Sequence, residues 1–142
     1  MKTRLFYLVL FLICFQLLSC AEDDNLPLVD LAVLIDSEAY NSALSDNYVI
    51  QSIKINGDFL IIKFSASGCS GESWKVKLID SGALAYSFPP QRYLVLSLEN
   101  NEECEAYITK ELAFDISALR GVSTNKVWLN FKNFEKGILY EY

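Results

Sequence analysis

Short stretches in which apolar and polar residues alternate dominate the second half of the chain. Residues 74–79 read Trp-Lys-Val-Lys-Leu-Ile, so the tryptophan, valine and leucine share one face and the two lysines share the other. The same period of two recurs in three later stretches, at 93–98, 112–116 and 127–131. Because successive side chains of a strand point to opposite faces of a sheet, each stretch predicts a half-buried β-strand.

A β-hairpin is predicted earlier in the chain. Val49–Ile55 is rich in β-branched residues and ends at Asn56-Gly57, a dipeptide suited to the positive-φ positions of a two-residue hairpin turn. Phe59–Ser65 should then return antiparallel. This return strand and residues 94–98 are nearly continuous apolar runs, so we expect the two to form the centre of the core.

The remaining segments complete an all-β pattern. Residues 28–44 fit either a helical face or a strand, and we expect a strand at Leu31–Asp36 followed by an irregular turn or short helix. Ile138–Tyr142 supplies a final strand. Seven or eight short strands in one unit indicate a single antiparallel β-sandwich of immunoglobulin-like kind. A small closed β-barrel is the alternative.

The N-terminus has the pattern of a secretion signal. Met1–Arg4 is basic, Leu5–Leu18 is almost wholly apolar, and Ser19-Cys20 follows. The apolar run is shorter than the roughly 20 residues that a membrane-spanning helix needs. We therefore expect residues 1–19 to be a cleaved signal peptide, and an uncleaved N-terminal anchor is the alternative.

Leu17-Leu18-Ser19-Cys20 resembles the lipobox of bacterial lipoprotein precursors. The resemblance implies that Cys20 becomes the acylated first residue of the mature protein, held on the membrane by two or three acyl chains. A plain secretory signal is the alternative. Ala21–Asn25 is acidic and resembles the export tag of Bacteroidota-type surface lipoproteins, although any solvated tether could look the same. The resemblance implies a surface-exposed lipoprotein of the outer membrane.

This division leaves an acidic tether at residues 20–25 and one folded domain at residues 26–142. The whole chain has 12 basic and 18 acidic residues, and loss of Lys2 and Arg4 with the signal takes the net charge from −6 to −8. Nucleic acid binding requires a basic surface, so we expect no nucleic acid partner. Membrane contact should come from the lipid on Cys20.

Two cysteines remain after Cys14 leaves with the signal and Cys20 is acylated. In an oxidising envelope compartment, Cys69 and Cys104 are expected to form a disulfide. The bridge would close a loop of about 36 residues and stabilise the fold by roughly 3–4 kcal/mol. Two buried free thiols are the alternative.

The sequence argues against an enzyme. The chain has no histidine, which removes the commonest general base, the serine and cysteine triads that use it, and the most usual zinc ligands. Gly68-Cys69-Ser70-Gly71 approaches a nucleophile-elbow pattern, but its second glycine comes one residue early and no histidine is present to activate Ser70. We expect no catalytic, cofactor-binding or metal-binding residues.

A cluster of carboxylates remains as a candidate site. Paired carboxylates can hydrolyse glycosides when they face each other across a cleft, and carboxylates can also bind calcium. The carboxylates in question are those of Glu99, Glu102, Glu103 and Glu105. They fall on one predicted hairpin turn, where we expect them to project together into solvent, and they lack EF-hand spacing.

Aromatic residues offer a second candidate site. Trp128 alternates with the inward set of its strand, and Tyr86, Phe88 and Tyr93 flank Pro89-Pro90, which requires a loop. Exposed aromatics beside a rigid proline loop could bind a sugar or a protein. Core packing and cover of a strand edge are the alternative roles.

Several stretches of the chain after Cys20 resemble small uncharacterised Bacteroidota-type lipoproteins, a group for which the resemblance implies no activity. The stretches are 67–74, 90–92, 104–106 and 138–142. We therefore expect a non-catalytic, membrane-anchored binding or accessory module with a protein or glycan partner. The alternative is a small inhibitor of an extracellular or periplasmic hydrolase that inserts the loop at Phe88-Pro89-Pro90.

Overall fold

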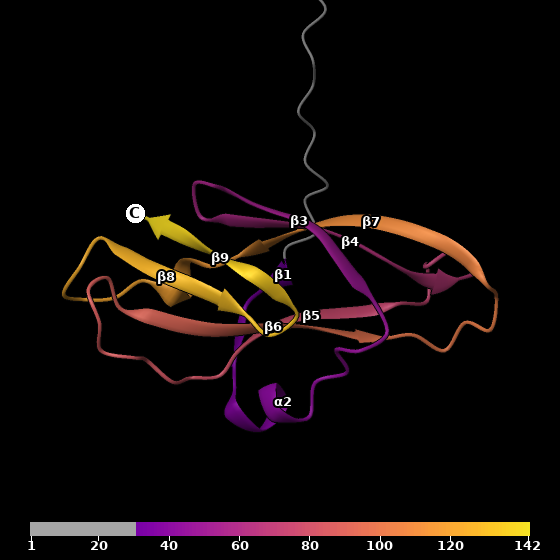
Figure 1. Ribbon diagram of the computed structural model, residues 1–142, viewed down its shortest axis with the longest axis horizontal. Helices are drawn as coiled ribbons and strands as arrows, with labels where there is room; N and C mark the ends of the chain where they lie inside the picture. The colour runs from indigo at the N-terminus through magenta and orange to yellow at the C-terminus, as the bar shows by residue number, and fades with distance from the viewer. Residues whose placement is uncertain (1–30) are drawn as a thin grey trace, which may run out of the picture.

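The computed structural model describes residues 31–142, and it confirms a β-sandwich (Figure 1). One sheet has four strands in the order β1-β7-β4-β3. Their bounds are β1 Leu31–Ala32, β3 Val49–Asn56, β4 Phe59–Gly68 and β7 Ala106–Asp115. The predictions for the signal peptide, for Cys20 and for the tether lie outside the described residues.

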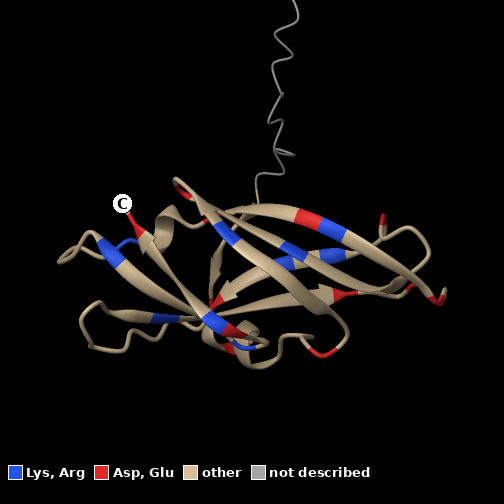
Figure 2. Cartoon of the chain, turned by 45° about the horizontal axis from the view of Figure 1, so that its top comes forward, with Lys and Arg blue, Asp and Glu red and all other residues tan. Residues whose placement is uncertain are grey.

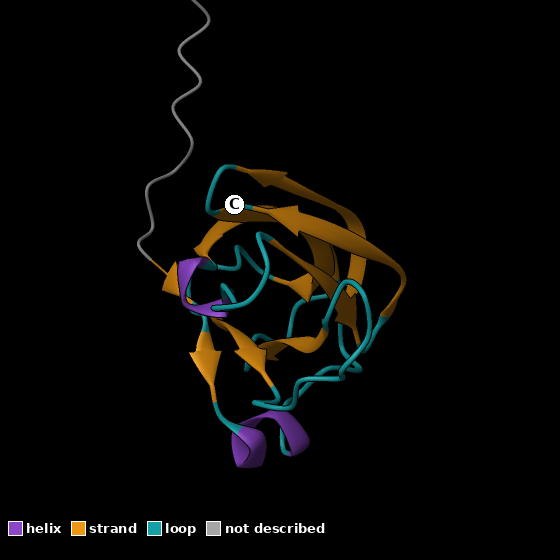
Figure 3. Cartoon of the chain, turned by 90° about the vertical axis from the view of Figure 1, so that its left-hand side faces the viewer, coloured by secondary structure: helices purple, strands orange, loops and turns teal. Residues whose placement is uncertain are grey.

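The second sheet has five strands in the order β2-β5-β6-β8-β9. Their bounds are β2 Leu34–Ile35, β5 Lys75–Asp80, β6 Gln91–Glu99, β8 Lys126–Phe131 and β9 Phe134–Glu141. A short helix, α2, spans Ser37–Asn41, and a 3-10 turn, η2, spans Ser117–Leu119. In the end-on view of Figure 3, α2 lies outside the strands, at the bottom of the picture. Within residues 31–142, no helix has the length and apolar character needed to cross a membrane.

Strand direction differs from the fully antiparallel expectation at three pairs. β1 runs parallel to β7, β2 to β5, and β6 to β8. After β6 the chain crosses to the other sheet and returns through β7, so β8 starts at the same end of the sandwich as β6. Residue periodicity reports which face is buried and carries no information on such crossovers.

The expected first strand, at residues 31–36, is divided between the two sheets. Val33 donates its backbone N–H to Asp115 in the first sheet, and Asp36 donates to Asp80 in the second, each at 3.0 Å. The Val33 side chain is buried at the crossing. Asp36 then caps α2 by accepting the N–H groups of residues 38 and 39, so the predicted short helix is confirmed.

The core lies between the inner faces of the two sheets. The alternating side chains of β4 and β6 are at its centre, as predicted, and all six are essentially inaccessible to solvent: Leu60, Ile62, Phe64, Leu94, Leu96 and Leu98. Trp74 and the apolar residues of β8 complete it.

Two local expectations were wrong by a few residues. Asn56 pairs with Phe59, so the hairpin turn consists of Gly57 and Asp58, with positive φ only at Gly57. The last strand, expected from Ile138, begins at Phe134. It starts early because a two-residue turn after β8 brings Phe134 opposite Phe131.

Candidate binding site

The predicted disulfide between Cys69 and Cys104 is present and joins two loops at one end of the sandwich. The two Cα atoms are 4.8 Å apart, and the cysteines are 35 positions apart in the sequence. Cys69 follows β4 directly and Cys104 precedes β7, so the bridge lies where two neighbouring strands meet.

Glu102, expected to project into solvent, is instead held inside the loop that follows β4. Its carboxylate accepts the backbone N–H groups of Cys69, Ser70 and Gly71 at 2.5–3.1 Å and the Ser73 hydroxyl at 2.8 Å. These hydrogen bonds, the one from Gly71 foremost, lower the pKa of Glu102 to about 2. Ser70 therefore contributes to a backbone nest for a carboxylate.

The other carboxylates of this turn do not assemble into a facing pair. Glu99 forms an ion pair with Lys75 at 3.0 Å across β5 and β6, and Glu103 and Glu105 are exposed. Within residues 31–142, no group of three or more acidic or cysteine side chains lies close enough to hold a metal ion.

The aromatic and proline loop lies at the opposite end of β6, beside an apolar pocket. The pocket has a volume of about 150 Å³ and lies between residues 84–90 and residues 119–124. Tyr86 and Phe88 are 96% and 86% exposed, and Val122 is fully exposed. Exposed apolar groups gathered around a pocket are characteristic of a contact surface for another molecule.

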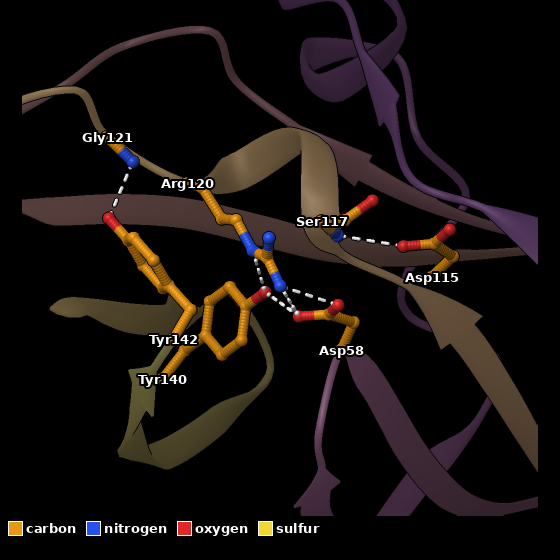
Figure 4. A network of polar contacts seen from close by, with 7 residues as sticks. All are labelled: Asp58, Asp115, Ser117, Arg120, Gly121, Tyr140 and Tyr142. Atoms are coloured by element: carbon orange, nitrogen blue, oxygen red, sulfur yellow. Dashed lines mark hydrogen bonds and ion pairs between the residues drawn. The ribbon is translucent and has the colours of Figure 1, made fainter. Parts of the chain in front are cut away.

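A polar network holds one wall of the pocket in place (Figure 4). Arg120 donates to both carboxylate oxygens of Asp58, in the β3–β4 turn, at 2.5 and 2.6 Å. The Tyr140 hydroxyl donates to Asp58 at 2.5 Å and accepts from Arg120 Nε at 3.1 Å. The backbone N–H of Gly121 donates to the Tyr142 hydroxyl at 2.6 Å. Residues from two distant segments, the β3–β4 turn and the end of the chain, thus fix the 117–121 segment.

The same contacts determine the ionisation of this network. Hydrogen bonds from Tyr140 and Arg120 lower the pKa of Asp58. Burial, together with the bond to Asp58, raises the pKa of Tyr140. Asp58 is therefore the charged acceptor and Tyr140 the neutral donor at pH 7.

Arg92 lines the pocket and pairs with a buried acid. Its Nη1 lies 3.0 Å from Asp80 Oδ1, and its Nε donates to the Leu119 carbonyl at 3.1 Å. Asp80 is inaccessible to solvent, and burial raises the pKa of its carboxyl despite the bonds from Gly82 and Arg92. Arg92 consequently links β6 to the segment around Leu119, which also lines the pocket.

The remaining aromatic candidates serve the fold. Trp128 is half-buried, and its ring lies so close to Gly137 on β9 that a Cβ there would be 2.1 Å from Nε1. Trp128 thus covers the neighbouring strand. Tyr93 lies on β6 and is partly exposed, but it does not line the pocket.

Fold and site together define a class of molecule: a two-sheet, disulfide-bridged β-sandwich with an aromatic pocket at one end. Three solved structures with a similar fold come from Bacteroides and Parabacteroides. A NigD-like immunity protein from Bacteroides caccae superposes with a TM-score of 0.59 at 11% identity, covering 78% of this chain and 58% of that one.

Two further structures are similar. A Bacteroides vulgatus protein of unknown function gives a TM-score of 0.52 at 16% identity, covering 80% of this chain and 57% of that one. A protein described as a toxin-related protein, from Parabacteroides distasonis, gives a TM-score of 0.52 at 17% identity, covering 80% of this chain and 60% of that one. These sources are consistent with the Bacteroidota-type resemblance of the sequence. The likeness concerns the fold, and the chain spans less than two thirds of the length of each.

Comparison by sequence adds no assignment. No protein-family model matches the chain, and no curated protein is similar to it in sequence.

Proposed function

We propose that this protein is a lipid-anchored lipoprotein of the outer membrane that binds another molecule through its aromatic end and catalyses no reaction. The observation that carries the binding role is the exposure of Tyr86 and Phe88 beside an apolar pocket. Large aromatic side chains supply much of the energy of protein interfaces, and burying them on a partner removes them from water.

The anchoring part of the proposal rests on the sequence. The lipobox at Leu17–Cys20 and the acidic residues after it suit an acylated protein carried to the cell surface. Acylation at Cys20 would keep the domain at the membrane without any apolar patch devoted to lipid. The aromatic end is then free to contact an extracellular or envelope component.

A second candidate function is inhibition of a toxin or hydrolase. It is favoured by the similarity of the fold to that of a NigD-like immunity protein. If the protein is such an inhibitor, the loop that carries Phe88 enters the active site of the target enzyme. Unchanged activity of candidate lytic enzymes at micromolar protein would count against it.

Site-specific photocrosslinking in cells tests the binding role. A benzoyl-phenylalanine replaces Tyr86 in one strain and Tyr107, an exposed residue at the start of β7 and the opposite end of the sandwich, in a control strain. We expect discrete crosslinked products from position 86 and none from position 107. Products from both positions, or from neither, would contradict a dedicated contact surface at the aromatic end.

The anchor is tested separately. Intact mass spectrometry of the membrane-extracted protein should show cleavage before Cys20 and two or three acyl chains, and protease treatment of whole cells should remove the domain. An unacylated soluble product would refute the anchoring part of the proposal.

A further inference from the structure

The pocket at the aromatic end has the size and lining for one large apolar side chain. Its volume is about 150 Å³, and a dry apolar cavity of this size accommodates a benzene ring. Most of its wall is apolar, contributed by Leu84, Tyr86, Leu119, Val122 and Tyr142.

Two hydroxyl groups at the pocket, those of Thr124 and Tyr142, already form hydrogen bonds within the protein. Thr124 uses its hydroxyl on the backbone of Lys126, accepting from the N–H at 3.2 Å and donating to the carbonyl at 2.5 Å. Recognition of a sugar ring needs several free hydrogen-bonding groups aimed at its hydroxyls. The pocket therefore favours an apolar group.

One cation at the rim is not paired with a carboxylate. Arg92 and Arg120, which also border the site, form ion pairs with Asp80 and Asp58. Lys126 forms no ion pair among residues 31–142, although Glu141 is its neighbour across β8 and β9. Its ammonium instead lies 5.5 Å from the centroid of the exposed Phe88 ring.

The distribution of charge favours approach of a negative group to this end. The chain carries a net charge of −6, yet its acidic turn lies beyond Glu99 and the pocket lies beside Gln91, at opposite ends of β6. Figure 2 shows acidic residues in the loops of the end away from the C-terminus, whereas basic residues lie on strands in both halves of the sandwich. A negative group would therefore be repelled by the acidic turn, and at the pocket the ammonium of Lys126 would attract it.

From these observations we propose that the pocket receives one large apolar side chain of a protein partner, and that a carboxylate adjacent to this side chain pairs with Lys126. This inference rests on the proposed binding function and adds the chemistry of the partner. Phe88 and Tyr86 flank the inserted side chain, and burial of the inserted group brings the carboxylate to the ammonium at the rim.

Two small probes that differ only in charge test the pairing. N-acetyl-phenylalanine carries a carboxylate beside its ring, and N-acetyl-phenylalaninamide does not. Each is titrated into the full-length protein in detergent, and the methyl signals of Leu84 and Val122 are followed by NMR. The exposed methyl groups of Val49 on β3 report non-specific effects.

We expect saturable shifts of Leu84 and Val122 with both probes and none at Val49. The acid should bind about two- to fivefold more tightly than the amide, the range that a partly exposed ion pair gives. Lys126→Gln should abolish this difference while leaving the shifts produced by the amide. Its side chain keeps a similar length, so the apolar part of the site stays intact.

Three outcomes would overturn the inference: no saturable shift at the pocket, equal affinity for the two probes, or a charge preference that survives Lys126→Gln. Equal affinity with shifts at the pocket would refute the role of the carboxylate and leave the proposed binding function standing. Crosslinking from position 86 decides that function independently, so the two failures can be told apart.

Discussion

Removal of the disulfide should cost the protein a large part of its stability. We consider the double substitution Cys69→Ser with Cys104→Ser. The bridge joins residues 35 positions apart, and the chain-entropy relation for a loop of this length gives about 4 kcal/mol at 25 °C. For a domain of roughly 100 residues this corresponds to a fall in Tm of about 15–20 °C.

The structure indicates where this free energy resides. Glu102 accepts the backbone N–H groups of Cys69 and Gly71, and these bonds do not involve the sulfur atoms, so the loops should stay docked in the folded variant. The loss then comes chiefly from greater freedom of the unfolded chain. A less compact unfolded state also exposes more surface, so the urea m-value should rise.

Urea unfolding followed by tryptophan fluorescence measures both quantities, because Trp74 is buried beside the bridged loop. Ser70→Ala, in the same loop, serves as the matched control and should change the free energy of unfolding little. A loss below about 1 kcal/mol in the double variant, with an unchanged m-value, would refute the reasoning. It would mean that the bridge does not restrict the unfolded chain.

Three further predictions concern other parts of the molecule. The pKa of Glu102 is lowered from 4.5 to about 2, so its stabilisation is present above pH 4.5 and is lost as the pH falls toward 2; Glu102→Gln should flatten the decline of Tm over this range. Tyr142→Phe should lower stability by about 1 kcal/mol and accelerate hydrogen exchange at the Gly121 amide, because the Gly121 N–H donates to the Tyr142 hydroxyl. Leu96→Ala should cost about 2–5 kcal/mol in urea unfolding, because the side chain is fully buried.

Matched controls make these predictions decisive. Glu103→Gln removes an exposed carboxylate from the turn that carries Glu102. This variant should lose Tm at low pH as steeply as the wild-type protein does. Tyr107→Phe removes an exposed hydroxyl on β7 and should not change exchange at Gly121. Equal effects of target and control would contradict the assigned hydrogen bonds. For Leu96→Ala, a loss below about 1 kcal/mol would contradict its place in the core.

The half-buried strands could be predicted because apolar and polar residues alternate along them in the sequence. A strand with one face in the core needs an apolar residue at every second position, and β5, β6 and β8 show this period. The disulfide was predictable from the number of cysteines. The parallel pairs were not, since they depend on which end of the sandwich the chain reaches after a crossover.

The site could be predicted only in part. The prolines required a loop beside Tyr86 and Phe88, but its opposing wall comes from residues 119–124, which no local pattern connects to it. The Asp58–Arg120–Tyr140 network was missed because its members come from three distant segments. The role of Glu102 was also missed, although glycines at 68 and 71 beside a predicted disulfide signalled a tight backbone loop able to surround a carboxylate.

The division of residues 31–35 between the two sheets has a mechanical consequence. A tensile force applied at Leu31 and directed along the chain would load hydrogen bonds to Asp115 in one sheet and to Asp80 in the other. Both short strands lie beside longer strands, so such a pull would act in shear, and several bonds would have to break together. If the chain is tethered through its N-terminus, drag on a bound partner would therefore be distributed over both layers of the sandwich rather than peeling one strand from its edge.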